Sequence, residues 1–311
     1  MNVSSKNRGN IDWIAVDWGT STLRVQAMDH HGEVLASAHS DNGMGKLGAD
    51  DFEPALLRLI ADWLPESTAR PLPVLICGMA GARQGWREAA YRFLPCAPVS
   101  GDMLTEVATS EARIHVQIIP GLAQADPADV MRGEETQIAG LLARGTCDAT
   151  VCLPGTHCKW VRLKAGEVVE FSTVMTGELF SLVSQYSILR YSVDAALKPA
   201  GTSAFLEAVD QMIRTPAELT AALFSIRARD LLGKDQEAGA ALSGLLIGAE
   251  LAGQIANWQG QTVHLVGDAA LVSLYAKALA HVGAEPVIED GSALALAGLC
   301  QVRNQISEIT P

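Results

Sequence analysis

The chain has 311 residues, 49% of them hydrophobic and 19% charged, and 23 Lys+Arg against 35 Asp+Glu give a formal net charge of −12. At roughly 100–200 residues per domain this length predicts two domains, and the hydrophobic content excludes disorder along most of the chain. The acidic balance argues against a nucleic acid or an anionic membrane as the main partner, although a local cluster of donors still binds a small anion.

Membrane and secreted proteins are also excluded. No apolar run approaches the ~18–20 residues of a membrane span, because polar residues and glycines interrupt the richest stretch, 242–256. Residues 1–10 form a polar lead-in that we expect to be mobile, and Asp12 and Asp17 break the apolar segment that a signal peptide needs. The six cysteines show no C-x-x-C and no paired metal spacing, which indicates buried, reduced thiols in a cytoplasmic protein.

The first half of the chain has the pattern of an antiparallel meander followed by alternating helices and strands. Short apolar or alternating segments between turn residues predict three strands, at 11–17, 22–28 and 33–39. Helical spacing and then two compact apolar runs predict a helix and two further strands, at 54–64, 74–77 and 114–119. This order indicates a mixed α/β layer structure.

The second half repeats the order. A helix is predicted at 134–144, with Gly145 just past its end, and three strands follow it, at 149–153, 158–163 and 167–172. The later elements are predicted helices and two short strands, at 203–213, 216–232, 240–258, 262–266 (strand), 271–282, 286–288 (strand) and 292–302. Because the halves match in outline, we expect an N-terminal domain at 11–145 and a C-terminal domain at 146–311, related by duplication.

Each half carries a Gly-Thr turn at the tip of its first hairpin, Gly19-Thr20 and Gly155-Thr156. Backbone N–H groups and a hydroxyl in such a turn form a concavity that binds phosphate oxygens without a Lys. One Gly-Thr pair is more simply a common tight turn, but two in matching places favour a grip on successive phosphates of one nucleotide. Asp17, directly before the first turn, is either a turn former or a carboxylate that holds Mg²⁺ through water.

Two carboxylates open the helix at 134–144. Glu134 and Glu135 follow Gly133, and the helix dipole favours acidic residues in a first turn whatever their function. The same field keeps a carboxylate ionised, as a general base for a substrate hydroxyl must be. Both residues lie within i+3 or i+4 of Ile138, so periodicity leaves open which of them faces a site.

The glycine-containing loop 78–86 follows a buried strand and carries three long side chains, Arg83, Gln84 and Trp86. Ligand contacts concentrate on such loops, and an Arg there can pair bidentately with a substrate carboxylate. A solvated surface loop is the plain alternative.

Familiar nucleotide and hydrolase motifs do not fit. Gly43, Gly45 and Gly48 match G-x-G-x-x-G, but Asp50 and Asp51 would repel a pyrophosphate at that helix start, so we expect no Rossmann site. The sequence around the same glycines does not match a Walker A loop either. No G-x-S-x-G or H-E-x-x-H occurs, so hydrolases and zinc proteases lack support.

The most specific segments are V-D-W-G-T-S-T-L-R (16–24), G-M-A-G-A-R-Q-G-W (78–86), M-R-G-E-E-T-Q-I (131–138), L-P-G-T-H-C-K-W-V (153–161) and L-F-S-I-R-A-R-D-L-L (223–232). With the two hairpins and the late strand–Gly–helix, they resemble the sugar kinase/actin/Hsp70 superfamily, and within it the chain is similar to the 2-dehydro-3-deoxygalactonokinases. The resemblance extends over nearly the whole chain. It implies an α/β fold of two ribonuclease H-like (actin-like ATPase) domains with an interdomain cleft.

The resemblance also implies roles for individual residues. Asp17 would be the catalytic acid linked to Mg²⁺, and Glu134 takes the place of the Asp base of related carbohydrate kinases. The implied nucleotide-binding residues are Gly19, Thr20, Ser21, Thr22, Gly155, Thr156, His157, Lys159, Gly267 and Asp268. The candidates for binding the sugar acid are Asn42, Arg83, Gln84, Trp86, Glu135 and Thr176. Two features depart from the wider superfamily: Glu replaces Asp as the base, and Gly267-Asp268-Ala269 replaces a run of glycines.

The implied activity is phosphorylation of 2-dehydro-3-deoxy-D-galactonate by ATP at its 6-hydroxyl, in galactonate catabolism. ATP and Mg²⁺ are the implied cofactors, and the sugar acid and ATP are the implied partners. The alternatives are a kinase of the same fold for another sugar or sugar acid, and a nucleotide-switched ATPase or binding protein. The sequence leaves open the choice between galactonate- and gluconate-derived substrates, and the oligomeric state, for which a homodimer is one option.

Overall fold

The chain forms two compact units. The computed structural model describes residues 10–193, 202–234 and 237–309. The first unit comprises Met1–Cys147, Gly166–Val168 and Ser292–Pro311, and the second comprises Asp148–Ala165 and Val169–Gly291. The expected lead-in at 1–10 lies outside the described residues except for Asn10. Within the described ranges, no helix combines the length and apolar character needed to cross a bilayer.

A six-stranded sheet forms the centre of the first unit, in the order β3-β2-β1-β4-β7-β6. Its strands are β1 Trp13–Trp18, β2 Leu23–Met28, β3 Val34–Ser40, β4 Leu72–Gly78, β6 Thr105–Val107 and β7 Ile114–Ile118. β1, β2 and β3 pair antiparallel, whereas β4 and β7 continue the sheet in parallel from β1. The predicted meander and the two predicted strands after it are therefore confirmed.

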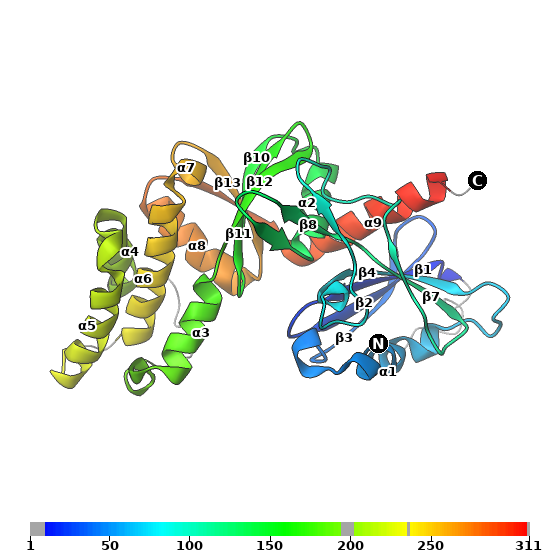
Figure 1. The fold of residues 1–311 in the computed structure, drawn as a ribbon, viewed down its shortest axis with the longest axis horizontal. Helices are drawn as coiled ribbons and strands as arrows, with labels where there is room; N and C mark the ends of the chain where they lie inside the picture. The colour runs from blue at the N-terminus through cyan, green and yellow to red at the C-terminus, as the bar shows by residue number, and fades with distance from the viewer. Residues whose placement is uncertain (1–9, 194–201, 235–236, 310–311) are drawn as a thin grey trace. The chain divides into compact units, whose positions relative to one another are not determined.

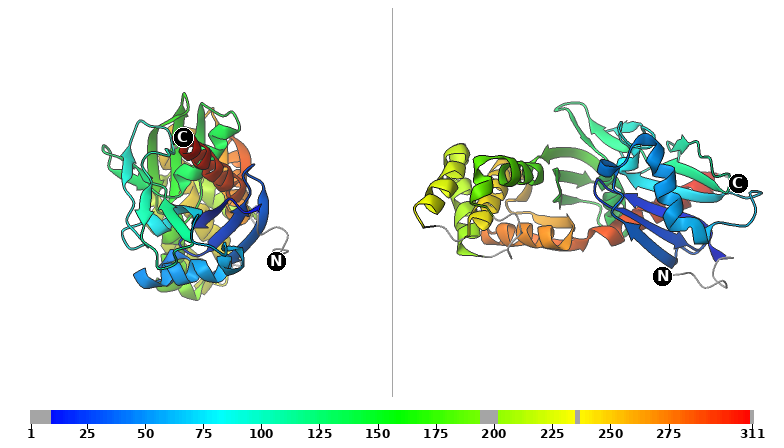
Figure 2. Two further views of the ribbon diagram at one scale, coloured as in Figure 1. Left: turned by 90° about the vertical axis from the view of Figure 1, so that its right-hand side faces the viewer. Right: turned by 90° about the horizontal axis from the view of Figure 1, so that it is seen from below.

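Helices cover both faces of this sheet because side chains alternate along its strands. Val16 faces α1 (Phe52–Ile60), whose apolar residues fill one core. Trp13 faces the other way and packs with α2 (Glu134–Ala143) and α9 (Gly291–Ile309). Figure 2 shows α1 and α9 on opposite sides of the sheet.

The closing helix α9 belongs to the first unit, which differs from the expected C-terminal domain at 146–311. It approaches α2 backbone to backbone through two glycines. A Cβ on Gly298 would lie 1.9 Å from the Thr136 carbonyl oxygen, and one on Gly140 would lie 2.0 Å from that of Leu294. Burial of its apolar face on the first sheet decides this placement, and chain order alone does not reveal it.

A small three-stranded sheet was not predicted. It has the order β5-β8-β9 and consists of β5 Tyr91–Phe93, β8 Gly121–Gln124 and β9 Asp129–Met131. Strands of three or four residues are too short to show a period of two, so sequence patterning misses them.

The second unit has a five-stranded sheet in the order β12-β11-β10-β13-β14. Its strands are β10 Ala149–Leu153, β11 Cys158–Lys164, β12 Glu167–Val174, β13 Thr262–Gly267 and β14 Glu285–Asp290. β10 pairs antiparallel with β11 and parallel with β13, which pairs in parallel with β14. The first unit contains the same order in β3-β2-β1-β4-β7, so the expected α/β class with two ribonuclease H-like domains is confirmed.

Helices make up most of the rest of the second unit (Figure 1): α3 Thr176–Tyr186, α4 Ser203–Arg214, α5 Leu219–Leu231, α6 Ala238–Gly253, α7 Ile255–Trp258 and α8 Ala269–His281. α4 and α6 pack closely because α6 presents glycines. A Cβ on Gly244 would lie 2.3 Å from the Phe205 carbonyl oxygen. α4, α6 and α8 bury their apolar side chains against the sheet. The helix α3 was not predicted, since it buries only Thr176 and Ser184 and has no clear apolar face.

Candidate active site

The first Gly-Thr turn joins β1 to β2 and consists of Gly19, Thr20, Ser21 and Thr22. The Gly19 N–H donates to the Thr22 carbonyl at 2.9 Å and closes the turn. Thr20 and Ser21 are exposed, and among the described residues no protein acceptor receives their amide N–H groups. The turn therefore presents amides and hydroxyls to solvent, as a phosphate site requires.

The loop after β3 packs against this turn. The Gly45 N–H donates to the Thr20 carbonyl oxygen at 2.9 Å, and a Cβ on Gly43 would lie 2.3 Å from the same oxygen. Asn42 is half-buried here, and its carbonyl accepts a hydrogen bond from Trp18 Nε1 at 2.9 Å. The glycines of the G-x-G-x-x-G match thus allow this loop to approach the first Gly-Thr turn.

Asp17 lies at the end of β1, directly opposite Arg24 of β2. Arg24 Nη1 donates to Asp17 Oδ2 at 3.2 Å, and 27% of the Asp17 side chain is exposed. Burial raises the pKa of Asp17, and Arg24 partly opposes that effect. The sequence analysis did not assign Arg24 a role, although the hairpin register places it opposite Asp17 because both are equally far from the turn.

The carboxyl ends of β1 and β4 meet the start of α2. Gly78, the last residue of β4, has φ +92°, and a Cβ there would lie 2.6 Å from the Trp18 carbonyl oxygen. Gly133, just before α2, has φ +107°, and its Cβ would lie 3.2 Å from the Gly78 Cα. Only glycine fits both positions. Ligands of parallel α/β sheets bind at this edge, and Glu134 begins α2 beside it.

The two glutamates of α2 have different surroundings. Glu135 is fully buried, and its carboxyl oxygens accept from the Gly133 N–H at 2.6 Å and from Thr136 Oγ1 at 3.1 Å. Burial, and then the charge of Glu134, raise the pKa of Glu135 to about 8. Glu134 is only half-buried and accepts from the Arg132 N–H at 3.0 Å. A substrate hydroxyl can therefore reach Glu134 more directly than Glu135.

Arg132 is a buried cation that the sequence analysis did not single out. Its Nη2 donates to the Ala89 carbonyl at 2.7 Å, and its guanidinium lies 4.4 Å from the centre of the Tyr91 ring. Nε and Nη1 are buried and have no acceptor within the described part of the chain. Gly81 leaves room for it, since a Cβ there would lie 2.8 Å from Nη1. An open cavity of about 530 Å³ is lined by residues 87–91.

The glycine-containing loop 78–86 after β4 presents two of its three candidate side chains to solvent. Arg83 is 80% exposed, and its Nε lies 3.3 Å from Glu88 Oε1. Gln84 is exposed as well. Trp86 instead packs against Trp18, with 6.0 Å between ring centroids, and belongs to the edge of the first core. Its ring therefore supports the loop by packing.

The second Gly-Thr turn joins β10 to β11, and the start of α3 packs onto it. Thr156 and His157 are exposed. The Glu178 N–H donates to the Thr156 carbonyl at 2.9 Å, and Glu178 Oε2 lies 2.6 Å from His157 Nε2. A Cβ on Gly177 would lie 2.3 Å from the Gly155 carbonyl oxygen, so only glycine permits this contact.

The end of β13 lies beside the same turn. A Cβ on Gly267 would lie 3.2 Å from the Pro154 carbonyl oxygen. The next residue, Asp268, is the N-cap of α8 and accepts from the Ala270 N–H at 3.0 Å. Its carboxylate therefore has a structural use that the sequence analysis did not assign.

Two polar side chains of the second unit are buried. Lys159 lies on β11, opposite Leu153 of β10, and is 5% exposed. Within the described residues no carboxylate pairs with it. Thr176 is 6% exposed, and its hydroxyl donates to Glu250 of α6, which the sequence analysis did not assign a role. No local signal marks Glu250, because its partners lie far away in sequence.

The candidate residues thus gather in two groups, one in each unit. The first unit holds Asp17, Gly19, Thr20, Ser21, Thr22, Asn42, Arg83, Gln84, Trp86, Glu134 and Glu135. The second unit holds Gly155, Thr156, His157, Lys159, Thr176, Gly267 and Asp268. Within each unit the turn and the carboxyl ends of the parallel strands come together, as required for a ligand site.

Comparisons with known proteins point to one family. The family model described as 2-keto-3-deoxy-galactonokinase matches residues 17–302. A Rhizobium meliloti (strain 1021) protein named "Probable 2-dehydro-3-deoxygalactonokinase" is 42% identical over 299 residues, covering 92% of this chain and 95% of the relative. The Escherichia coli (strain K12) 2-dehydro-3-deoxygalactonokinase is 35% identical over 307 residues, covering 95% and 98%. The crystal structure of a Sinorhizobium meliloti protein bearing the same kinase name aligns with a TM-score of 0.86 at 41% identity, covering 94% and 96%.

Proposed function

The chain belongs to the 2-keto-3-deoxy-galactonokinase family, and from this premise we propose how its residues phosphorylate 2-dehydro-3-deoxy-D-galactonate. The enzyme is a sugar-acid kinase, a phosphotransferase that uses ATP. Its products are 2-dehydro-3-deoxy-6-phosphogalactonate and ADP. The observation that carries this function is the similarity to two named kinases over more than nine tenths of the chain.

Glu134 is the general base for the 6-hydroxyl. It accepts the hydroxyl proton as the substrate oxygen forms a bond to the γ-phosphorus and the bond to the β–γ bridging oxygen breaks, which leaves ADP. Its half-buried position at the first turn of α2 supports this role, because a substrate hydroxyl can reach the carboxylate there. Glu135 is enclosed by its own hydrogen bonds and keeps the helix start in place.

Each Gly-Thr turn is suited to binding phosphate oxygens of the nucleotide. Exposed amides and hydroxyls at Thr20, Ser21 and Thr156 supply donors for phosphate oxygens, and the ammonium of Lys159 adds a positive charge. Such donors matter because positioning and electrostatics account for most of the catalysis of phosphoryl transfer. Gly267, which closely approaches the second turn at Pro154, would contact the nucleoside.

Asp17 is the residue that would hold Mg²⁺. Its donor chemistry fits, since Mg²⁺ prefers carboxylate oxygens and retains most of its water. Arg24 contacts Oδ2, and the side chain is partly exposed beside the first turn. When bound, the ion supplies positive charge against the β- and γ-phosphates.

Arg83 and Gln84 bind the carboxylate end of the sugar acid. Both are exposed on the loop that follows β4, and Arg pairs well with carboxylates. Trp86 holds that loop against Trp18 and so keeps the two side chains near the end of β1. Asn42 stands beside the first turn, where it can contact a substrate hydroxyl.

The proposed function is tested by identifying the product. Purified protein is incubated with Mg·ATP and a panel of 2-keto-3-deoxy sugar acids, including the galactonate- and gluconate-derived epimers. We expect phosphorus NMR to reveal a phosphate monoester on the terminal oxygen of the galactonate-derived acid. A phosphomonoester formed only with another sugar would show that the substrate is that sugar and not the galactonate-derived acid. The absence of any phosphorylated acid would contradict the function.

A further inference from the structure

A buried carboxyl group that the proposed reaction does not use joins three parts of the second unit. Glu250 of α6 is 4% exposed and accepts three hydrogen bonds. The donors are Trp160 Nε1 at 2.7 Å, Tyr275 Oη at 2.7 Å and Thr176 Oγ1. All four side chains are buried, and a buried polar group left without its partner is costly. The four groups therefore form a network that is sensitive to the loss of any member.

Each donor lies on an element that carries or adjoins proposed nucleotide-binding residues. Trp160 is on β11, the strand that leaves the second Gly-Thr turn. Tyr275 is on α8, whose N-cap is Asp268. Thr176 is the first residue of α3, which packs on the turn. Glu250 itself is on α6, so one carboxyl group links a fourth element to these three.

The contact between α3 and the turn is close enough to transmit a shift. Thr176 precedes Gly177, whose Cβ position lies 2.3 Å from the Gly155 carbonyl oxygen. The Glu178 N–H then donates to the Thr156 carbonyl at 2.9 Å. The first turn of α3 has no free space against the second Gly-Thr turn. Movement of Thr176 would therefore displace both the start of α3 and the Gly-Thr turn.

We propose that Glu250 is a positioning residue for the nucleotide phosphates, acting through Thr176 and Trp160 on the second Gly-Thr turn. The inference rests on the proposed function, because that turn matters only if it binds phosphate. Glu250 touches neither the nucleotide nor the sugar acid in this account. It fixes the geometry of the turn before the ligand arrives.

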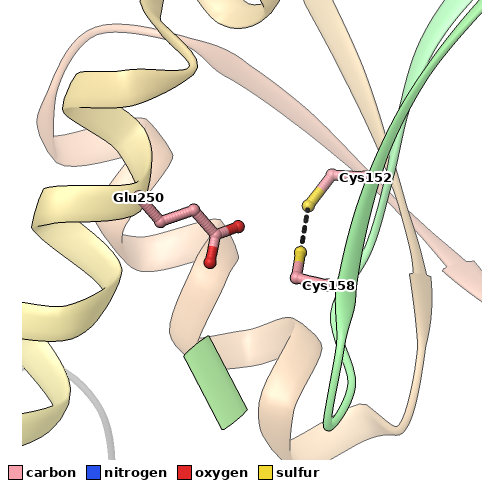
Figure 3. Close-up of side chains that lie close together, drawn as sticks. All are labelled: Cys152, Cys158 and Glu250. Carbon is pink, nitrogen blue, oxygen red and sulfur yellow. Dashed lines mark hydrogen bonds between the residues drawn. The ribbon is translucent and has the colours of Figure 1, made fainter. Parts of the chain in front are cut away.

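The same cluster has the donor set of a metal site, which needs an explanation. Ligand atoms of Cys152, Cys158 and Glu250 all lie within 4.8 Å of one another. Figure 3 shows the carboxyl group of Glu250 pointing toward the two sulfur atoms, which are 3.6 Å apart. The carboxyl oxygens, however, already accept three hydrogen bonds, from Trp160, Tyr275 and Thr176, and burial raises the pKa of both thiols. Hydrogen bonds therefore account for this arrangement.

The test compares Glu250→Gln with wild type. An amide has one acceptor oxygen, so it cannot satisfy all three donors while keeping the shape of the side chain. We expect the KM for ATP and the calorimetric Kd for ATP to rise by about tenfold to a hundredfold, because small misplacements of binding groups have effects of that order. The KM for the sugar acid should stay within about twofold of wild type. A general loss of stability would not separate the two KM values in this way.

Two tryptophans provide a matched pair. Trp160→Phe removes the indole donor to Glu250, and Trp258→Phe removes an equally buried indole that donates to the Leu251 carbonyl at 2.8 Å. We expect the first to weaken ATP binding more than the second at similar losses of thermal stability. This pair and Thr176→Val keep the proposal testable if Glu250→Gln does not fold.

The inference is overturned if folded Glu250→Gln binds ATP like wild type, or if both tryptophan variants weaken ATP binding equally. Stoichiometric zinc in the purified protein, lost in Cys152→Ser, would also overturn it. If wild type phosphorylates no sugar acid, the proposed function fails. The calorimetric Kd for ATP still decides the role of Glu250 in that case.

Discussion

Glu134 and Glu135 are adjacent in the chain and have opposite environments. The side chain of Glu135 points inward and is held by the Gly133 N–H and the Thr136 hydroxyl. Glu134 stays half-buried at the edge where β1, β4 and α2 meet. Helical periodicity leaves the choice between them open, because neighbouring positions in a first turn can both reach a site. The backbone conformation at Gly133, just before the helix, gives the two glutamate side chains their different surroundings.

Glu134→Gln should lower kcat by about 10²–10⁴-fold, the usual contribution of a general base. Its Kd for ATP should remain close to that of wild type, since the phosphate turns are untouched. Steady-state kinetics and calorimetry measure the two quantities. Glu135→Gln is the paired variant, and our assignment of the base is wrong if this variant, correctly folded, loses kcat and Glu134→Gln does not.

The stability of the protein should depend on pH through Glu135. Its pKa is raised from the ordinary 4.5 of a glutamate to about 8 in the folded state, so the folded state binds more protons than the unfolded state between these values. The free energy of unfolding therefore falls as pH rises from 4.5 to 8. In Glu135→Gln, which resembles the protonated side chain, denaturant titrations should give a smaller decrease over this range. An unchanged slope would contradict a raised pKa.

At the level of elements, the local features were predictable and the distant contacts were not. Turn residues and alternating strands predicted both hairpins, because a hairpin is encoded within about 20 residues. The placement of α9 depends on packing between Thr136 and Gly298, which are far apart in the chain. Glu250 lies 90 residues from Trp160 and 74 from Thr176, so sequence patterning carries no sign of that network.

The contact between α3 and the second turn predicts the effect of a single methyl group. Gly177→Ala places a Cβ 2.3 Å from the Gly155 carbonyl oxygen, so the turn must shift. We expect a rise of about tenfold or more in the KM for ATP, with little change in the KM for the sugar acid. Gly253→Ala in α6 is the control, because its Cβ would meet no atom within 4 Å. Equal effects of the two substitutions would refute the contact's role.

The whole molecule has a formal net charge of −12, and both of its proposed ligands are anions. Binding of two anions would therefore depend on local donors, and we propose the two turns, Lys159 and Arg83 as their source. The fold repeats one sheet order in both units, and in each repeat the Gly-Thr turn of the first hairpin lies beside the carboxyl ends of parallel strands.

The central claim is that phosphoryl transfer from ATP requires the sugar acid. A coupled assay of ADP release, run on purified protein with Mg·ATP, measures this most directly. We predict turnover with 2-dehydro-3-deoxy-D-galactonate and a rate lower by orders of magnitude without it or in Glu134→Gln. ADP release that is equally fast without any sugar acid would identify an ATPase and contradict the account.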